Sequence, residues 1–326
     1  YFGVYTRRFI EKGVRMMGGC CGTTPEHISK MANSLAMKQT RVQHSMKTGM
    51  KPAPKEPLPD PVPVEKKSQL SARLSSGKQV VLVEMVPPRS IDIRKPLEGA
   101  RLLLDHGVDA INIPDGPRAS ARMTGLSLAV LLQNQVGIET VIHYTCRDRN
   151  LLGMQSDLLG AAAMGIRNIL AITGDPPMIG DYPQATAVFD IDAIGLVHLI
   201  SNLNRGLDVG EKRIGDPTAF FTGVGLDPNS VNQENETGRL QEKREAGAEF
   251  IITQPVFDIP SLESFLEKTD LGDLYLITGI WPLVSLRNAE FMKNEVPGVY
   301  VPDAVISYIA RYESKEDQLK AGLEIA

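Results

Sequence analysis

One acidic residue lies where an acid is costly to place. Residues 80–86, VVLVEMV, read as a single apolar β-strand in which Glu84 is the one charge. A continuous apolar run is typical of a strand buried on both faces of a parallel sheet. A carboxylate there needs a partner or a task, and the carboxyl end of a barrel strand is where active sites are built. The alternative is an acid that turns to solvent or meets Arg89 beyond the two prolines.

Polar groups recur at the carboxyl ends of the strands that follow. In chain order they are Asn112 and Asp115; His143, Thr145, Arg147 and Asp148; Thr173, Gly174 and Asp175; Asp227; Thr253 and Gln254; and Gly279 and Trp281. Because these strand ends would meet at one rim, we expect a shared site. The sequence has no His-x-x-x-His pair or carboxylate cluster with metal-ligand spacing, and no Gly-x-Ser-x-Gly elbow. The rim therefore favours a large polar organic ligand over a metal.

Alternating strands and helices must position these groups. Strands are expected at residues 80–86, 110–114, 140–146, 168–173, 218–225, 250–256 and 275–280. Helices are expected at residues 94–106, 121–136, 151–164, 191–204, 237–246, 260–268 and 286–293, then at 303–312 and 315–324. This order predicts an α/β fold with a parallel sheet, and the lack of Gly-x-Gly-x-x-Gly after the first strand favours a (β/α)8 TIM barrel. No eighth strand follows, so we expect a barrel that lacks its last strand, in a chain cut at both ends.

Composition narrows the class of protein. The 326 residues suffice for two domains or for one barrel with an appendage. A net charge of −4 gives no global basic field, so we expect no nucleic-acid partner. No apolar run reaches the roughly 18 residues of a membrane span, so we expect no membrane partner. Three cysteines, two of them adjacent, form no disulfide framework and favour a cytoplasmic location.

The N-terminal part divides into two segments. Residues 1–37 read as a small folded piece, and residues 38–77 read as a linker because residues 51–67 contain six prolines among lysines and acids. The elements expected in the first piece are a helix at 1–12, a strand at 14–17 and a helix from Thr24 to about residue 37. The basic residues before the prolines fit a solvated tether; a polyanion-binding arm is the alternative.

A pair of cysteines lies in the Gly-rich turn of that first piece. Cys20 and Cys21 occur within GGCCG, between the expected strand and the second helix. Two thiolates supply only part of a tetrahedral zinc site, and a third protein ligand is needed. Cys146 reads as part of another domain. The alternative is two small residues in a tight turn.

The residues around these cysteines carry a resemblance. RMMGGCCGTTPEHI resembles the C-terminal end of the homocysteine S-methyltransferase family, a zinc (β/α)8 barrel. The resemblance implies that Cys20 and Cys21 are two zinc ligands whose third partner lies on an earlier strand. It covers only about residues 1–37, which would then be a C-terminal fragment of a second barrel. We expect this piece to hold an incomplete zinc site and to transfer no methyl group.

Five motifs in order carry a second and longer resemblance. VEMVPPR, IHYTCRDRN, AITGDPP, REAGAEFIITQPVFD and GIWPLVS resemble the methylenetetrahydrofolate reductase family, over a domain at residues 78–326. The resemblance implies a flavoprotein (β/α)8 barrel that passes a hydride from NADH or NADPH through FAD to 5,10-methylenetetrahydrofolate. The product is 5-methyltetrahydrofolate, an intermediate of one-carbon and methionine metabolism.

The family's residue roles map onto matching positions here. The resemblance implies that Glu84 protonates the folate, that Asp175 lies near flavin and pterin, and that Gln254 binds the folate. A strand-end carboxyl that is buried has the raised pKa such an acid needs. The residues that the resemblance implies for binding the cofactor are His143, Thr145, Thr173, Gly174, Asp175 and Lys243. For Lys243, an exposed helix lysine is an equal alternative.

Three positions depart from the family pattern. Leu286 stands where well-known members have a phenylalanine that packs on substrate, Asp227 where they have a tyrosine, and Thr173 where an arginine is frequent. These differences imply altered cofactor contacts more than a different reaction. They leave NADH, NADPH and a partner protein open as electron donors, and a homo-oligomer also stays open.

Two other hypotheses remain beside the flavin-dependent reductase. One is zinc-dependent homocysteine methyltransferase activity of a longer protein. The other is a truncated, inactive binding module, since an open barrel exposes two strand edges that invite pairing with another chain.

Overall fold

The computed structural model describes residues 2–14, 16–20, 22–36, 58–296 and 299–326. The chain separates into two compact units, residues 1–56 and 57–326.

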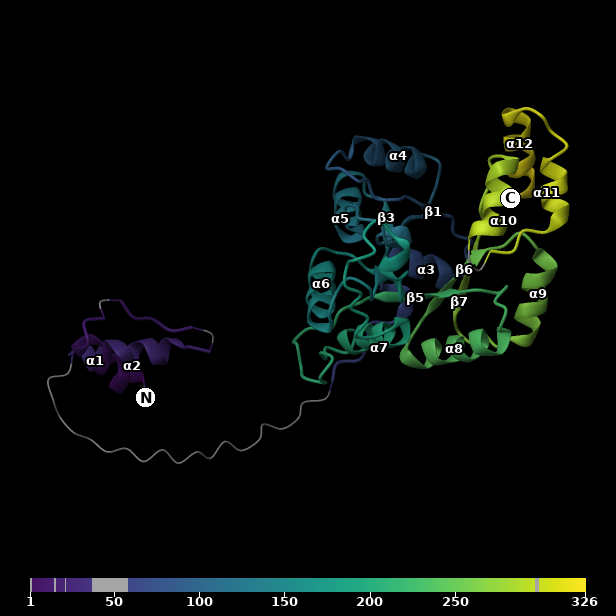
Figure 1. Cartoon of the computed structure of the whole chain (residues 1–326). Coiled ribbons are helices and arrows are strands. Elements are labelled where there is room, and N and C mark those ends of the chain that lie inside the picture. The colour runs from purple at the N-terminus through teal and green to yellow at the C-terminus, as the bar shows by residue number, and fades with distance from the viewer. Residues whose placement is uncertain (1, 15, 21, 37–57, 297–298) are drawn as a thin grey trace. The chain divides into compact units, whose positions relative to one another are not determined.

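Seven parallel strands form the sheet of the second unit, in the order β1 to β7, and each strand pairs with the next in sequence. Their bounds are β1 Leu82–Glu84, β2 Ala110–Ile113, β3 Glu139–Thr145, β4 Asn168–Ile172, β5 Phe221–Leu226, β6 Phe250–Pro255 and β7 Tyr275–Gly279. All seven expected strands are present. The fold is an α/β half-barrel, an incomplete TIM barrel, as the sequence predicted (Figure 1).

Helices follow the strands as expected. They are α4 Arg94–Asp105, α5 Gly125–Gln135, α6 Leu151–Ala163, α7 Ala193–Leu203, α8 Gln233–Ala246, α9 Ile259–Lys268, α10 Leu286–Glu295, α11 Asp303–Ile309 and α12 Lys315–Ile325. Side-chain caps explain the boundaries that differ from prediction. Thr124 Oγ1 accepts from Ser127 N and delays the start of α5, whereas Asn232 accepts from Asn235 N and starts α8 early.

The two faces of the sheet pack into different apolar clusters. Outward residues such as Ile111, Ile142 and Ile251 contact the helices in the larger cluster. Inward residues alternate with them and form a smaller cluster, comprising Leu70, Ala110, Val141, Leu170, Phe221 and Phe250, with Leu82, Ile172, Ile252, Tyr275 and Ile277 partly buried against it. The period of two along each strand therefore tells which side chains line the interior.

A short helix seals the amino end of this interior. Residues 64–75, which we expected in the linker, contain the 3-10 turn η1 Val64–Lys66 and the helix α3 Gln69–Ser75. Leu70 on α3 is 1% exposed among the inward residues. Glu139 at the start of β3 accepts from the backbone N–H groups of Gln69 and Leu70. The expected linker boundary at residue 77 is therefore wrong in structural terms, because α3 is packed against the sheet.

A buried ion pair fixes the same segment. Lys67 Nζ lies 2.6 Å from Glu249 Oε1 and donates to the carbonyl of Phe220 at 3.0 Å. Glu249 Oε2 accepts from Thr222 N. Both charges are thus hydrogen-bonded, and Lys67 is nearly fully buried.

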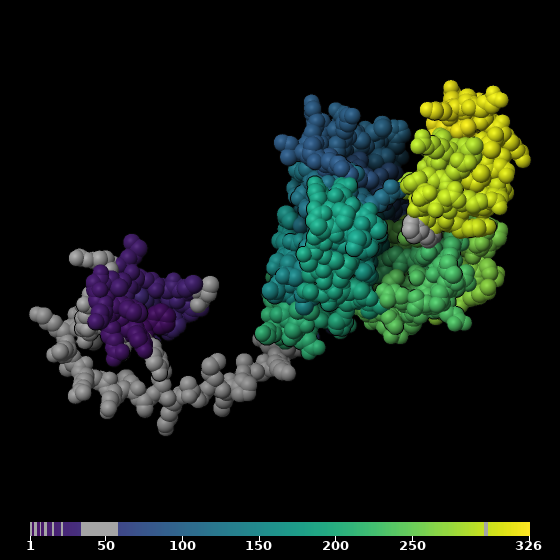
Figure 2. Space-filling view, viewed as in Figure 1, coloured from purple at the N-terminus to yellow at the C-terminus, as the bar shows by residue number. Residues whose placement is uncertain are grey.

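The last three helices, α10 to α12, build a separate apolar cluster around Leu283, Met292 and Val301. Gly322 on α12 is required there, since a Cβ at this position would lie 1.6 Å from the Leu283 carbonyl oxygen. The Arg118 guanidinium in the loop after β2 lies 5.1 Å from the centre of the Phe291 ring on α10. In the space-filling view, a hollow separates the teal surface from the green and yellow surfaces of this unit (Figure 2).

The first unit contains the helices α1 Phe2–Glu11 and α2 Pro25–Ala36. The Phe2 and His27 rings stack with centroids 4.7 Å apart. The strand expected at residues 14–17 is wrong, since Val14, Met16 and Met17 are not in a strand, and a strand needs a pairing partner. Apolar residues of α1, together with Val14 and Met16, line a cavity of about 560 Å³.

Candidate active site at the carboxyl ends of the strands

Glu84 ends β1 on the inner face of the sheet. It lies in register with Asn112 of β2, two residues along from the inward pair Leu82 and Ala110. The Glu84 side chain is reached by solvent at the open edge, yet the protein around it removes enough water to raise the pKa of this carboxyl. In the described part of the chain, no cation pairs with it. A proton is therefore held more tightly here than on an ordinary glutamate.

His143 lies on the same inner face, on β3, two residues beyond Val141. Its Nε2 atom is shielded from solvent and has no hydrogen-bond partner among the described residues. Burial lowers the pKa of His143 to about 4, although the nearby Asp115 charge acts in the opposite direction. The imidazole is therefore neutral at pH 7, with one ring nitrogen available to a ligand.

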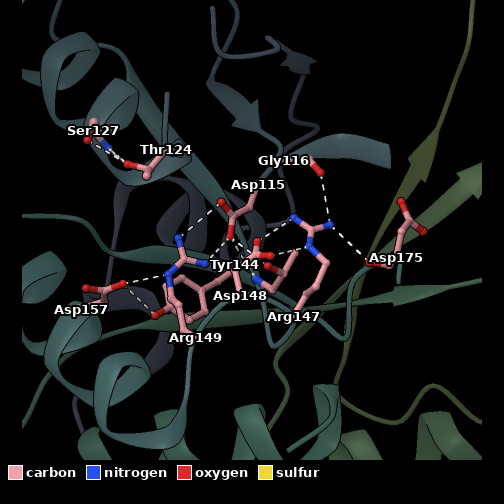
Figure 3. Close-up of polar contacts among 11 residues, drawn as sticks. Asp115, Gly116, Thr124, Ser127, Tyr144, Arg147, Asp148, Arg149, Asp157 and Asp175 are labelled. Atoms are coloured by element: carbon pink, nitrogen blue, oxygen red, sulfur yellow. Dashed lines mark hydrogen bonds and ion pairs between the residues drawn. The ribbon is translucent and has the colours of Figure 1, made fainter. Parts of the chain in front are cut away.

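Asp115 is the centre of a network that joins the ends of β2 and β3 (Figure 3). Its Oδ2 accepts from the backbone N–H and the hydroxyl of Thr145, at 3.3 and 3.1 Å, and from Arg149 Nη1 at 2.7 Å. Arg149 Nε donates to Asp157 at 2.9 Å, and its guanidinium lies over the Tyr144 ring at 4.7 Å. Asp115 and Thr145 are buried. The network fixes the loop that follows β3.

Arg147 connects three loops of the rim. It forms two hydrogen bonds with the carboxylate of Asp148, at 2.8 and 2.7 Å, and its Nη1 donates to the carbonyls of Gly116 and Asp175, at 3.3 and 3.4 Å (Figure 3). The Arg147 side chain is buried, whereas its partner Asp148 is about half exposed. Arg147 therefore holds the backbone of Asp175 while the Asp175 side chain stays exposed.

The segment Thr173-Gly174 packs directly against β3. The carbonyl of Thr173 accepts from Cys146 N, and its hydroxyl accepts from Ala193 N at the start of α7. Gly174 has φ +92°, and a Cβ there would lie 3.0 Å from Thr145 Cβ. The strained backbone and the close approach both require glycine. The Thr145 and Thr173 hydroxyls are thus engaged with the protein itself.

Lys243 on α8 is buried against β5. Its Nζ donates to the carbonyl of Gly225 at 2.9 Å, and burial lowers its pKa. The alternative of an exposed helix lysine is therefore wrong. Gly225 faces the interior, in line with the inward Phe221, and a Cβ there would meet no heavy atom within 4 Å. The inner face is open at this position.

Gln254 lies where the pairing of β6 with β7 is irregular. The register shifts between Ile252 and Pro255, and the Gln254 side chain is exposed. Gly279 N donates to Thr253 Oγ1 at 2.9 Å, and a Cβ on Gly279 would lie 2.6 Å from the Thr253 carbonyl. Such an irregularity changes the direction of the side chain at the end of a strand, here that of Gln254.

The structure thus brings most of the expected site residues to one end of the sheet. Glu84 and His143 share its inner face, while Thr145, Thr173 and Gly174 form one packed layer. Sequence reasoning assigned no role to Asp115 or Arg147 and did not single out Arg149. The two arginines flanking Asp148 in CRDRN were the available signal, but their partners are distant in the chain.

In the second unit, a pocket of about 190 Å³ lies between α3 and the amino ends of the strands, at the opposite end of the sheet from these residues. Within the described ranges, no three His, Cys, Asp or Glu residues come together as a metal site. Cys20 is exposed, and Cys21 falls outside the described residues. In the same ranges, no helix is long and apolar enough to cross a membrane.

Comparison with known families agrees with this architecture. The model of the methylenetetrahydrofolate reductase family matches residues 69–326, most of the chain. The chain therefore belongs to the methylenetetrahydrofolate reductase family. The homocysteine S-methyltransferase model matches residues 2–35, which is a short N-terminal stretch of that second family.

Individual relatives are distant. The chain is 28% identical over 234 residues to a protein from Oryza sativa named probable methylenetetrahydrofolate reductase (NADH), covering 68% of this chain and 39% of that protein. It is 26% identical over 217 residues to the 5,10-methylenetetrahydrofolate reductase of Pectobacterium carotovorum, covering 66% and 67%. The chain thus spans about two fifths of the plant relative.

One of the solved structures that this chain resembles has a comparable fold. It is described as an uncharacterized protein from Clostridium thermocellum that binds two copies of 5-methyl-5,6,7,8-tetrahydrofolic acid. The TM-score is 0.55 at 14% identity, covering 79% of this chain and 85% of the other. At this identity the likeness concerns the fold alone.

Proposed function

We propose that this protein reduces 5,10-methylenetetrahydrofolate to 5-methyltetrahydrofolate with FAD as the hydride carrier and NADH or NADPH as the donor. The observation that carries the proposal is the position of Glu84. In a member of this family, an unpaired carboxyl with a raised pKa lies on the inner face of the sheet, at its carboxyl end. We place the reaction in the cytoplasm.

The residues at this end fit a flavin. A large polar ring system needs hydrogen-bonding atoms on an open surface, and His143 Nε2 is a shielded atom without a partner among the described residues. Gly225 leaves the inner face open. We infer that His143, Gly174, Asp175 and the backbone of Thr145 and Thr173 hold the cofactor. When bound, FAD accepts a hydride from the nicotinamide and delivers it to the folate.

Lys243, which the resemblance implies for cofactor binding, lies buried against β5. One of its three N–H groups is used by the Gly225 carbonyl. Its lowered pKa reflects burial, and it gives a positive charge behind the inner face. We propose that this charge supports an anionic part of the cofactor through the remaining N–H groups.

Glu84 acts on the substrate. We propose that its carboxyl proton passes to a ring nitrogen of the folate, so that the C–N bond of the five-membered ring breaks and leaves an iminium cation. Glu84 becomes a carboxylate, and the cation is then the hydride acceptor. Asp175 is expected to stabilise positive charge that develops beside it, and Gln254 to bind the folate by its amide.

Two measurements test this proposal. Denaturing the purified chain and assaying the supernatant for FAD should give stoichiometric flavin; no flavin after incubation with FAD would favour the inactive binding module. Glu84→Gln should nearly abolish folate reduction and leave flavin reduction by NADH or NADPH largely intact. Glu98→Gln on α4 changes an exposed acid as a control. Equal loss of both half-reactions would remove Glu84 from the acid role.

Homocysteine S-methyltransferase activity of a longer protein stays the alternative hypothesis. It rests on the match of residues 2–35 and on Cys20 and Cys21 as zinc ligands. Zinc binding by the chain, measured by metal analysis after dialysis, tests it.

A further inference from the structure

Glu84 has one polar neighbour built into the sheet. Its register partner on the adjacent parallel strand is Asn112, and both side chains project from the inner face of the sheet. Adjacent strands lie about 4.8 Å apart, so these two side chains are neighbours by construction. This register needs no loop to hold it, because Met85 N donates to the Asn112 carbonyl at 2.8 Å.

Asn112 has an acceptor that nothing uses. Its Oδ1 atom is shielded from solvent, and no donor reaches it within the part of the chain that the structure describes. On the far side its register partner is Val141, which has no polar side-chain atom. A shielded carbonyl oxygen without a donor is unfavourable, so this atom favours any neighbour that can donate to it.

Only one form of Glu84 can donate. A carboxylate has acceptors alone, whereas a protonated carboxyl has an O–H donor. We propose that Asn112 is a positioning residue. Its Oδ1 accepts a hydrogen bond from protonated Glu84 and keeps this carboxyl protonated before the substrate binds. The inference rests on the proposed function, because this hydrogen bond would prepare Glu84 for the proton transfer to the folate.

Charged side chains in the segments that follow β1 and β2 have other partners: Asp115 pairs with Arg149, Arg122 donates to the Pro87 carbonyl, and Arg89 pairs with Asp181. The Asp175 side chain, beyond the end of β4, is exposed to solvent. His143, on the inner face of β3, is neutral at pH 7. Burial is the cause of the raised pKa of Glu84, and a neutral acceptor beside it acts in the same direction.

The experiment is a pH titration of the full chain labelled with ¹³C at glutamate side-chain carboxyls and followed by NMR. Glu84→Gln assigns the signal. Asn112→Ala should increase the acid dissociation constant of Glu84 about tenfold, because the neutral form loses its acceptor. Val141→Ala opens the same layer of the interior but keeps Asn112, and it should leave the titration unchanged.

Two results would overturn the proposal. An unchanged pKa in Asn112→Ala would mean that Asn112 does not hydrogen-bond the carboxyl, and a higher pKa would mean that its amide N–H group stabilises the carboxylate instead. An equal shift in Val141→Ala would mean that entering water is the cause. Asn112→Ser keeps a hydroxyl acceptor of shorter reach and should give a smaller fall, so it tests the same sign if the alanine variant does not fold.

A second readout separates this proposal from the proposed function. Folate reduction by the holoenzyme should decline as pH rises through the Glu84 pKa, and in Asn112→Ala that decline should begin about one pH unit lower. A shifted NMR titration in a protein without folate reduction would keep the pairing and reject the function. Folate reduction with unshifted profiles would keep the function and reject the pairing.

Discussion

Arg149 Nη1 lies 2.7 Å from Asp115 Oδ2, and this ion pair joins the loop after β3 to the end of β2. The Asp115 side chain is 8% exposed, and it also accepts two hydrogen bonds from Thr145. The pair therefore holds the strand end that carries His143 and Thr145. Its burial distinguishes it from the exposed ion pairs of this protein, such as that between Arg94 and Asp92.

Arg149→Met should destabilise the second unit by about 3 kcal/mol, because it leaves the Asp115 charge buried without its cation. Urea unfolding at pH 7 measures the change. Arg94→Met removes the exposed pair as a matched control and should have no measurable effect. Equal midpoints for Arg149→Met and Arg94→Met would show that the Asp115 pair contributes little.

His143 should make stability depend on pH. Its folded pKa of about 4 is below the ordinary value of 6.5, so between these values the unfolded chain binds a proton that the folded chain does not. Stability should therefore fall as pH drops from 6.5 to 4, by about 3 kcal/mol from this group, and this contribution should be fully present well above pH 6.5. Comparing urea unfolding at pH 7.5 and 4.5 in His143→Gln and wild type isolates this contribution.

The control for that titration is His106→Gln, which changes an exposed histidine at the end of α4. It should keep the wild-type loss of stability between the two pH values. If His143→Gln loses as much stability as wild type on acidification, then His143 is protonated in the folded protein and is not shielded as the structure shows.

Asp175→Asn should keep FAD and slow folate reduction about tenfold, which corresponds to about 1.4 kcal/mol of transition-state stabilisation. The fold should be unaffected, since Arg147 contacts the Asp175 carbonyl oxygen and not its carboxylate. Flavin content and single-turnover folate reduction measure the two effects. Asp216→Asn changes another exposed aspartate for comparison. Complete loss of FAD would give Asp175 a binding role only.

Gly174→Ala should destabilise the rim by about 1–3 kcal/mol, since alanine meets both the positive φ and Thr145 at 3.0 Å. Gly160→Ala, within α6 and with open space around it, should stabilise the protein by about 0.5–1 kcal/mol. Thermal unfolding shifts of opposite sign are therefore expected. A neutral Gly174→Ala would mean that the segment after β4 adjusts without cost.

The seven strands could be predicted because each is a short apolar run bounded by turn residues, with a helical pattern between it and the next. The strand expected at residues 14–17 is wrong for a related reason, since an apolar run becomes a strand only where another strand pairs with it. The helix α3 was missed because its sequence sits after a proline-rich stretch. Only the amino end of the half-barrel interior gives Leu70 a place to be buried.

The sequence by itself determined the order of the strands, the presence of Glu84 at the end of the first one, and the polar character of the rim. The tertiary structure alone decided the partners: Asp115 with Arg149, Lys67 with Glu249, and Glu84 beside Asn112. Local patterns predict elements because they depend on neighbours a few residues apart. These pairings depend on sheet register and on contacts between residues that are 28 (112 − 84) to 182 (249 − 67) positions apart in the chain. No local pattern encodes contacts at such sequence separations.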